Sequence, residues 1–259
     1  IKKPKQIYIN TWHGTPLKYM GLDIENGLHG SQNIIKNFLS SDYLINPNRY
    51  TTTIFKRAFK LENIYGGEFL EIGYPRIDLT LNSTRKDIIS ELNHYLHINN
   101  DQSILLYCPT WRGEDVNAPE ASLNHIVEEV KKLETHLEYQ VLVKVHPYLY
   151  KDALKIKSLK PYLIPDYFDT NEILAIVDLM ITDYSSIFFD YLVTNKPIVF
   201  YTPDFDEYQS SRGMYIANHD LPGPVVHHID DVITEIKQKT YDNHSIKKSI
   251  NILNRSIHI

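Results

Sequence analysis

The sequence predicts an α/β protein whose strands lie mostly in parallel sheets. Short apolar segments alternate with segments of helical periodicity along most of the 259 residues. Several of the short segments are apolar throughout, as strands covered by helices on both faces are. Hydrophobic residues make up 42% of the chain, which is enough for one large domain or two smaller domains, each with its own core.

The expected strands are short apolar runs, most of them followed by turn residues. They occupy residues 6–10, 43–45, 68–72, 104–108, 140–145, 162–164, 179–182 and 198–201. The expected helices lie between them, with apolar residues at three- and four-residue spacing and, in most cases, a capping residue at the start. They begin near Ser31, Ser83, Pro119, Thr170, Ser185 or Ser186, and Asp230.

We place a domain boundary after Gly73-Tyr74-Pro75-Arg76, where the chain leaves one α/β unit. This gives a first domain of residues 1–76 and a second of residues 77–259. The first has three expected strands, fewer than a stable Rossmann-like sheet usually contains. The chain also begins without Met, at an apparent strand. We therefore expect a fragment in which the N-terminal domain is incomplete.

The charge balance excludes one class of partner. The net charge is −5, so no broad basic field is present to hold a nucleic acid through its phosphates. An anionic substrate must then be bound by a few placed cations and by helix N-termini. The one cysteine, Cys108, excludes an internal disulfide and fits a reducing compartment. No run reaches the roughly 20 apolar residues that span a bilayer, so any membrane association is expected to be peripheral.

The segment Thr-Trp-His-Gly-Thr-Pro-Leu-Lys at residues 11–18 follows an expected strand directly. It therefore lies at the carboxyl end of a sheet, where open α/β folds bind ligands. Gly14 allows a sharp turn or a close approach to a ligand, and Pro16 stiffens the loop. His13 would thus be held on a rigid turn, as a general base requires. A structural histidine bonded to the backbone fits the same loop equally well.

Two further polar segments also end expected strands. Thr110 offers a hydroxyl, and the planar guanidinium of Arg112 suits two phosphate oxygens. Strand alternation points Lys144 and His146 to the same face, beside a proline that stops the ladder. These side chains fit a phosphate clamp. A surface arginine, a solvated lysine and a capping histidine are the structural alternatives.

Residues 179–190 predict a strand, a tight turn and a helix. Ser185 and Ser186 would place hydroxyls and backbone N–H groups at the helix N-terminus, where an anion can bind. Simple capping is the alternative, and the two roles can coexist. We expect Asp183 to brace the turn, because a bare carboxylate would repel phosphate. No GxGxxG or Walker pattern is present, so dinucleotide and P-loop chemistry is not supported.

Residues 201–224 are rich in aromatic, acidic and turn residues and predict an ordered loop region over a polar ligand. Asp204, Asp206 and Glu207 could accept hydrogen bonds from a polyol or bind a cation. Nothing fixes a metal coordination set. The sequence therefore predicts no cofactor and no set of residues that would ligate a metal. Whether the protein uses a divalent cation stays open.

Six motifs occur in one order along nearly the whole chain. They are NTWHGTPLK at 10–18, GYPR at 73–76, CPTWR at 108–112, KVHP at 144–147, ITDYSS at 181–186, and RG at 212–213 with PGP at 222–224. Each motif alone is modest, but the ordered series resembles the CDP-glycerol glycerophosphotransferase family, which comprises teichoic acid primases and polymerases.

The resemblance implies a GT-B-like fold, in which two Rossmann-like domains face a cleft and the second holds most of the nucleotide donor. It implies that His13 is the base, that Arg112, His146, Ser185 and Ser186 surround the pyrophosphate, and that cytidine binds near residues 165–172. We assign catalytic roles to His13 and His146. The predicted substrate-binding residues are Gly14, Thr15, Lys18, Thr110, Arg112, Lys144, Asp183, Ser185, Ser186, Asp190 and Arg212.

The implied reaction transfers glycerol phosphate from CDP-glycerol to a hydroxyl of a teichoic-acid-like or capsular polymer, or of a lipid-linked acceptor, and releases CMP. Such an enzyme would act in the cytoplasm, peripherally on the inner face of the cell membrane, without nucleic acid. Three alternatives stay open: a CDP-ribitol donor, a GT-B glycosyltransferase that uses a nucleotide sugar, and a non-catalytic binding module.

Overall fold

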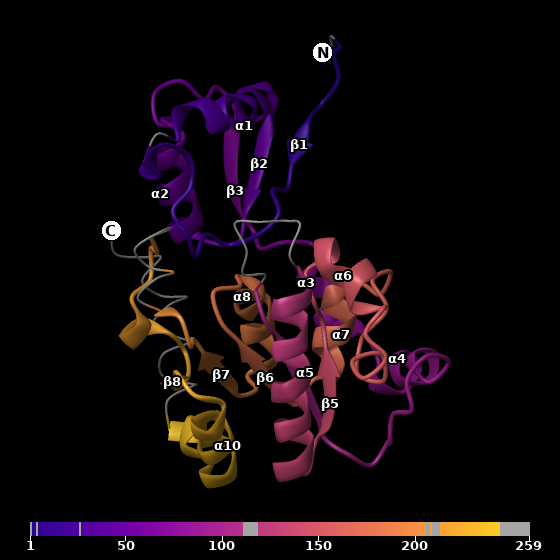
Figure 1. The fold of residues 1–259 in the computed structure, drawn as a ribbon. Coiled ribbons are helices and arrows are strands. Elements are labelled where there is room, and N and C mark those ends of the chain that lie inside the picture. Colours follow the sequence, from indigo (N-terminus) through magenta and orange to yellow (C-terminus); the bar gives the residue numbers. More distant parts are fainter. Residues whose placement is uncertain are drawn as a thin grey trace. The chain divides into compact units, whose positions relative to one another are not determined.

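The computed structural model describes residues 2–3, 5–25, 27–110, 119–205, 208 and 213–243. The chain forms two compact units (Figure 1). Among the described residues, unit 1 is drawn from Ile1–Pro75 and Asp206–Asp220, and unit 2 from Arg76–Phe205 and Leu221–Lys248. The division falls beside the expected boundary. It differs from the predicted domains in one respect, because Tyr208 and residues 213–220 group with unit 1.

The described part of unit 1 contains a parallel sheet in the order β1 (Ile9–Asn10), β2 (Tyr43–Asn46) and β3 (Glu68–Glu71). Parallel neighbours need crossover connections. Helix α1 (Leu28–Ser40), preceded by the 3-10 turn η1 (Gly21–Asp23), joins β1 to β2, and α2 (Arg49–Ala58) joins β2 to β3. The expected strands at 43–45 and 68–72 are confirmed, whereas the first strand is shorter than expected.

Helix α2 was not expected from the sequence. Three consecutive threonines at 51–53 have low helix propensity, because their β-branched side chains lose rotamer freedom in a helix. The structure shows what overrides this. The side chain of Asn48 accepts the N–H of Thr51 as an N-cap. The apolar face of the helix then joins a buried core made by Phe38, Leu44, Ile54, Phe55, Ala58, Phe59 and Leu61.

Unit 2 contains a parallel sheet in the order β5-β4-β6-β7-β8 among its described residues. The strands are β4 (Ile104–Cys108), β5 (Gln140–Val143), β6 (Leu179–Thr182), β7 (Ile198–Tyr201) and β8 (Val225–Val226). Strand β4 is the first strand of this sheet along the chain. Strand β5 follows and lies on one side of β4, and β6 comes next and lies on the other side. The topological switch point of this doubly wound sheet therefore lies between β4 and β6.

Helices cover both faces of this sheet. On one face, α5 (Pro119–His136), α6 (Pro147–Ala153) and α10 (Ile229–Gln238) share a buried core with alternate residues of β4, β5, β6 and β7 (Figure 1). On the other face, Phe188 of α8 (Ile187–Tyr191) lies with its ring 5.1 Å from that of Phe200 in β7. Helix α7 (Thr170–Ile176) contacts α8, α3 (Ile77–Asn82) and α4 (Arg85–Leu92).

Several expected boundaries in the chain were wrong in detail. Residues 162–164 form no strand, and Leu163 makes only an isolated bridge to Val143 of β5. Asp169, not Thr170, caps α7 by accepting the N–H of Asn171. Ser31 lies inside α1, where its hydroxyl donates to the carbonyl of Gly27. Strand β8 and helices α3 and α6 were not expected, because each is too short for its periodicity to stand out.

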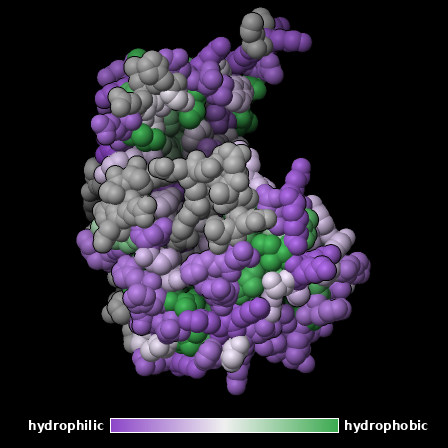
Figure 2. All heavy atoms as spheres, viewed as in Figure 1, coloured by the Kyte–Doolittle hydropathy of each residue, from purple (hydrophilic) through white to green (hydrophobic). Residues whose placement is uncertain are grey.

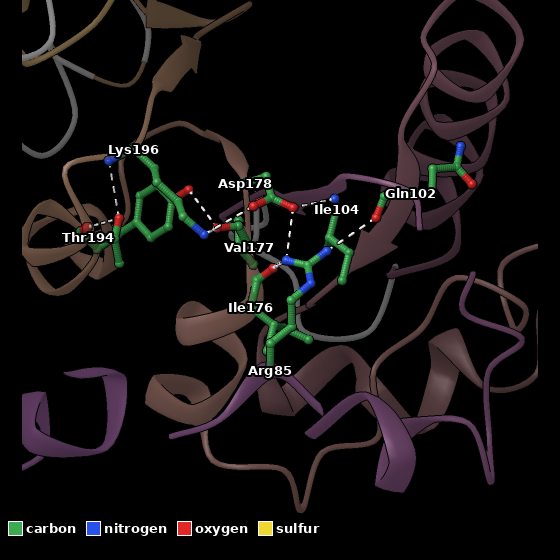
Figure 3. Close-up of polar contacts among 9 residues, drawn as sticks. Arg85, Gln102, Ile104, Ile176, Val177, Asp178, Thr194 and Lys196 are labelled. Atoms are coloured by element: carbon green, nitrogen blue, oxygen red, sulfur yellow. Dashed lines mark hydrogen bonds and ion pairs between the residues drawn. The ribbon is translucent and has the colours of Figure 1, made fainter. Parts of the chain in front are cut away.

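A polar network fastens the amino ends of β4 and β6 (Figure 3). The carboxylate of Asp178, just before β6, accepts the N–H of Ile104 at 2.9 Å, Nη1 of Arg85 at 3.0 Å and Nζ of Lys196 at 3.1 Å. Arg85 also donates to the carbonyls of Ile176 and Gln102. The network fixes the two strands whose opposite ends meet at the switch point.

On the face shown in Figure 2, the described residues of unit 2 are mostly hydrophilic, and the hydrophobic residues occur in small patches. The amphipathic helices explain this, because their apolar sides are turned into the core. Within the described residues, no helix combines the length and the apolar character needed to cross a membrane.

Candidate functional site

The carboxyl ends of the strands in unit 2 carry most of the predicted polar residues. Thr110 follows β4, Lys144 and His146 follow β5, and Asp183 to Ser186 follow β6. Open parallel sheets bind ligands at this edge, at the switch point of the strand order. The sheet order therefore brings three segments separated by 34 to 73 residues to one edge.

Thr110 and Asp183 bridge the switch point itself. The Asp183 carboxylate accepts the backbone N–H of Thr110 at 2.9 Å and its hydroxyl at 2.5 Å. Asp183 is only 3% exposed, and a buried carboxylate needs such donors. The expected bracing role is therefore observed. Because the hydroxyl of Thr110 donates its proton to Asp183, the lone pairs of its oxygen point away from that carboxylate.

The two serines after Asp183 differ in their local bonding. The hydroxyl of Ser185 accepts the N–H of Ile187 at 3.4 Å. Ser186 is the N-cap residue of α8, and its side chain makes no capping hydrogen bond. Both serines are half-buried. Helix α8 has five residues, so its dipole is small, and an anion here would depend on individual N–H and hydroxyl donors.

Lys144 and His146 occupy the end of β5 in different ways. Burial lowers the pKa of Lys144, although nearby Cys108, Asp169 and Asp166 act in the opposite direction. Its ammonium group lies 3.5 Å from the carbonyl oxygen of Phe168. His146 is exposed and caps α6, and its Nδ1 accepts the N–H of Tyr148 at 3.3 Å. The proton of the neutral ring therefore sits on Nε2, which makes that nitrogen a donor.

Asp190 has a partner of its own, away from the residues just described. Asp190 is 8% exposed and accepts both Nε and Nη2 of Arg76, at 2.6 and 3.0 Å. This ion pair gives the arginine of the GYPR motif a structural partner within unit 2. The contact of Asp190 with substrate stays a prediction. Arg112 and Arg212 lie outside the described residues.

A cavity of about 260 Å³ opens beside Thr110 in unit 2. Its wall includes Glu129 of α5, a buried acid whose Oε2 accepts the hydroxyl of Tyr107 at 2.6 Å. Asp204 also lines it and accepts the hydroxyl of Tyr184 at 3.0 Å. The sequence pointed to Asp204 but not to Glu129, because an acid inside an amphipathic helix gives no sign of burial.

His13 of unit 1 stands on an aromatic support. Its ring lies against the indole of Trp12, with centroids 4.1 Å apart. Trp12 has a φ of +53°, which is a strained value for a bulky residue. The backbone N–H of Trp12 donates to the side-chain oxygen of Asn10 at 2.9 Å. The indole packs against Phe38, Phe55 and Phe59. The turn therefore buries Trp12 in part and leaves His13 exposed.

The residues after His13 are also held in place. Gly14, Thr15 and Pro16 are buried, and the carbonyl of Pro16 accepts the hydroxyl of Tyr50 at 2.9 Å. Nζ of Lys18 donates to the hydroxyl of Tyr208 at 2.8 Å. Thr15 is thus enclosed by other residues of the protein. Its contact with substrate stays a prediction.

The segment after Arg212 pairs with this loop inside unit 1. Lys18 and Met214 form an antiparallel bridge, and the N–H of Tyr19 donates to the carbonyl of Gly213 at 3.3 Å. Gly213 has a φ of +65°, and a Cβ there would lie 2.2 Å from Cδ2 of Tyr19. The predicted motif at 10–18 and Gly213 of the last predicted motif thus belong to one assembly within unit 1.

Sequence reasoning missed the supports of this loop. Trp12, not Gly14, takes the left-handed conformation, and the stacking partner of His13 is its own neighbour. Among the described residues, no group of three or more His, Cys, Asp and Glu side chains is placed to hold a metal ion.

Comparison with known proteins identifies the fold and the family. Residues 1–258 match the family described as CDP-Glycerol:Poly(glycerophosphate) glycerophosphotransferase. The chain belongs to this family. The chain is 36% identical, over 93% of its length, to the teichoic acid poly(glycerol phosphate) polymerase of Bacillus spizizenii, covering 64% of that protein. It is 34% identical to the teichoic acid glycerol-phosphate transferase of Staphylococcus aureus, covering 92% of this chain and 63% of the relative.

The solved structure of the wall teichoic acid polymerase TagF resembles this chain, with a TM-score of 0.76 and 30% identity over 98% of this chain and 64% of TagF. The predicted GT-B-like α/β class is thereby confirmed. The chain spans less than two thirds of the length of these relatives. Solved TagF structures include a variant with one histidine replaced by asparagine, soaked with CDPG.

Proposed function

We propose that this chain carries the catalytic part of an enzyme that transfers glycerol phosphate from CDP-glycerol to a hydroxyl of a polyol-phosphate acceptor, and releases CMP. The observation that carries the proposal is the match over residues 1–258 together with an exposed His13 on a braced turn. The predicted domain roles follow from it: unit 1 presents the acceptor-side base, and unit 2 binds the donor.

In the proposed reaction, His13 takes the proton of the acceptor hydroxyl. The oxygen attacks the β-phosphorus of CDP-glycerol in line, the bond to the bridging oxygen breaks, and CMP leaves. One phosphoester forms for each anhydride bond that breaks, so the step needs no further reactant.

The proposed donor site lies at the carboxyl edge of unit 2. Nε2–H of His146, the hydroxyl of Ser186 and the N–H groups at the start of α8 supply donors to the pyrophosphate, with Arg112 as a further cation. Lys144 adds a positive charge to this site. Because its pKa is lowered, it loses its proton more readily than an exposed lysine does. Glu129 and Asp204 line the adjacent cavity with acceptors that suit hydroxyl groups.

A ribitol donor is the second candidate, because the relatives include a teichoic acid poly(ribitol-phosphate) polymerase, 31% identical over 180 residues. An acceptor linked to lipid would place the protein on the inner face of the cell membrane, in the cytoplasm where CDP donors are found.

The decisive experiment measures products of the purified full-length protein. CDP-glycerol, CDP-ribitol and a UDP-sugar are each supplied with a polyol-phosphate acceptor. Acceptor-dependent CMP release from CDP-glycerol supports the proposal. CMP from CDP-ribitol alone replaces the donor assignment, and release of UDP from the sugar nucleotide makes the protein a glycosyltransferase. No turnover of any donor, with tight acceptor binding, leaves a binding module.

A further inference from the structure

A groove of about 630 Å³ runs along α2 in unit 1. It is lined by residues of α2 from Arg49 onwards, by the turn after the helix and by Glu71 at the end of β3. Ten helical residues extend about 15 Å. The groove is therefore an elongated surface rather than a point site, and its volume is that of pockets that bind ligands.

Three cations in this groove carry charge that no described acid neutralises. Arg49, Lys56 and Lys60 line it, and none makes an ion pair with another described residue. Arg57, a fourth lining residue, is different because Asp23 pairs with it at 2.9 Å. In a chain with a net charge of −5, three such cations in one groove indicate an anionic occupant.

The groove also offers acceptors that a purely anionic ligand would not need. Glu62 and Glu71 line it but lie beyond ion-pair distance of its cations, since no such pair occurs within 4.0 Å among the described residues. Carboxylates accept hydrogen bonds from hydroxyl groups, and the amide of Asn63 can donate and accept. A ligand with both phosphates and hydroxyls matches this mixture.

We infer that the groove along α2 binds the polyol-phosphate chain of the acceptor, with phosphates on Arg49, Lys56 and Lys60 and hydroxyls on the two glutamates. The inference rests on the proposed function for the nature of the chain. An extended polymer with alternating phosphates and hydroxyls fits an elongated groove that carries both cations and carboxylates. A membrane of anionic lipids is the poorer match, because Glu62 and Glu71 would face its phosphates.

The test is direct binding of a fluorescent poly(glycerol phosphate) oligomer to the full-length protein, without donor nucleotide. The variants are Arg49→Gln with Lys56→Gln, and Lys60→Gln alone. The matched control is Lys3→Gln with Lys36→Gln, which removes the same charge from exposed lysines of unit 1 outside the groove. We expect the double groove variant to bind about tenfold more weakly, with a smaller dependence on salt, and the control to bind normally.

Unchanged affinity in the groove variants, or an equal loss in the control, overturns the inference. Loss of binding to phosphatidylglycerol vesicles with intact polymer binding also overturns it and makes the groove a membrane contact. Circular dichroism melting identifies a folding defect, and Lys56→Arg, which keeps the charge, must then retain affinity. Because the assay contains no CDP-glycerol, its outcome is independent of whether the protein releases CMP.

Discussion

The imidazole of His13 lies on the indole of Trp12, with ring centroids 4.1 Å apart and planes inclined by 31°. Trp12 is in turn inserted among Phe38, Phe55 and Phe59. The contact links the hydrophobic core of unit 1 to the one histidine that we propose as base. It explains why a bulky residue takes a strained φ of +53° here, since aromatic packing offsets the strain.

Replacing Trp12 should therefore lower turnover through His13. Trp12→Ala removes the supporting ring, and a base displaced by about 1 Å can lose about 100-fold in rate. The affinity for the donor nucleotide should change little. Turnover and nucleotide binding are measured separately, with Trp12→Phe as the variant that keeps a ring. Equal kcat values for all three proteins would show that the stacking does not position His13.

His13→Ala should reduce CMP release by at least about 100-fold, the usual contribution of a general base, and leave donor binding intact. His136, an exposed histidine at the end of α5 in unit 2, is the matched control, and His136→Ala should be fully active. Acceptor-dependent CMP release is the readout. Near-normal turnover by the His13 variant would remove it as the base.

The two serines before α8 should separate capping from donor binding. Ser186 makes no side-chain capping bond, so Ser186→Ala should leave the melting temperature unchanged and weaken donor binding by about two- to tenfold. Ser185 accepts the N–H of Ile187, so Ser185→Ala should also lower stability. Calorimetric titration with CDP-glycerol and thermal melting measure the two effects. Unaltered affinity in Ser186→Ala would exclude that hydroxyl from the phosphate site.

Gly213 should not tolerate alanine. Its φ of +65°, and the 2.2 Å that would separate an added Cβ from the ring of Tyr19, predict a loss of about 2 kcal/mol or more. Gly30 is the control, because it lies in α1 with nothing within 4 Å of its Cβ position. Gly30→Ala should stabilise the protein by up to about 1 kcal/mol. Denaturant unfolding compares the two, and similar free energies of unfolding would contradict the predicted strain.

Asp178 should contribute stability that depends on pH. Burial raises the pKa of its carboxyl, but the N–H of Ile104 and the charges of Lys196 and Arg85 outweigh this and hold the pKa below 3.8. The stabilisation is present above pH 3.8 and is lost as the pH falls through the lowered pKa. Asp178→Asn should cost about 1 to 3 kcal/mol near neutral pH.

Thermal melting of wild type and Asp178→Asn from neutral to acid pH checks this. The difference in stability should shrink below pH 3.8. A difference that stays constant through this range would show that the carboxylate charge is not what stabilises β4 and β6.

Much of the fold could be predicted from local pattern. Buried strands such as β4 and β6, and the long amphipathic α5, have periodicities that few other structures share. Helix α2 was not predicted, because its threonines oppose a helix and the core around Phe55, which favours it together with the Asn48 cap, forms only in the folded chain. Asp183 could be assigned a bracing role from charge alone, whereas its partner Thr110 follows only from the neighbouring placement of β4 and β6.

The sequence by itself determined the fold class, the family and the segments that carry polar chemistry, because these depend on short-range pattern and on residue identity. The tertiary structure decided which of those residues meet. It set Trp12 beneath His13, paired Asp190 with Arg76, and joined Gly213 to the His13 loop. Such contacts link residues far apart in the chain, or depend on a strained backbone that packing alone sustains, so no local pattern specifies them.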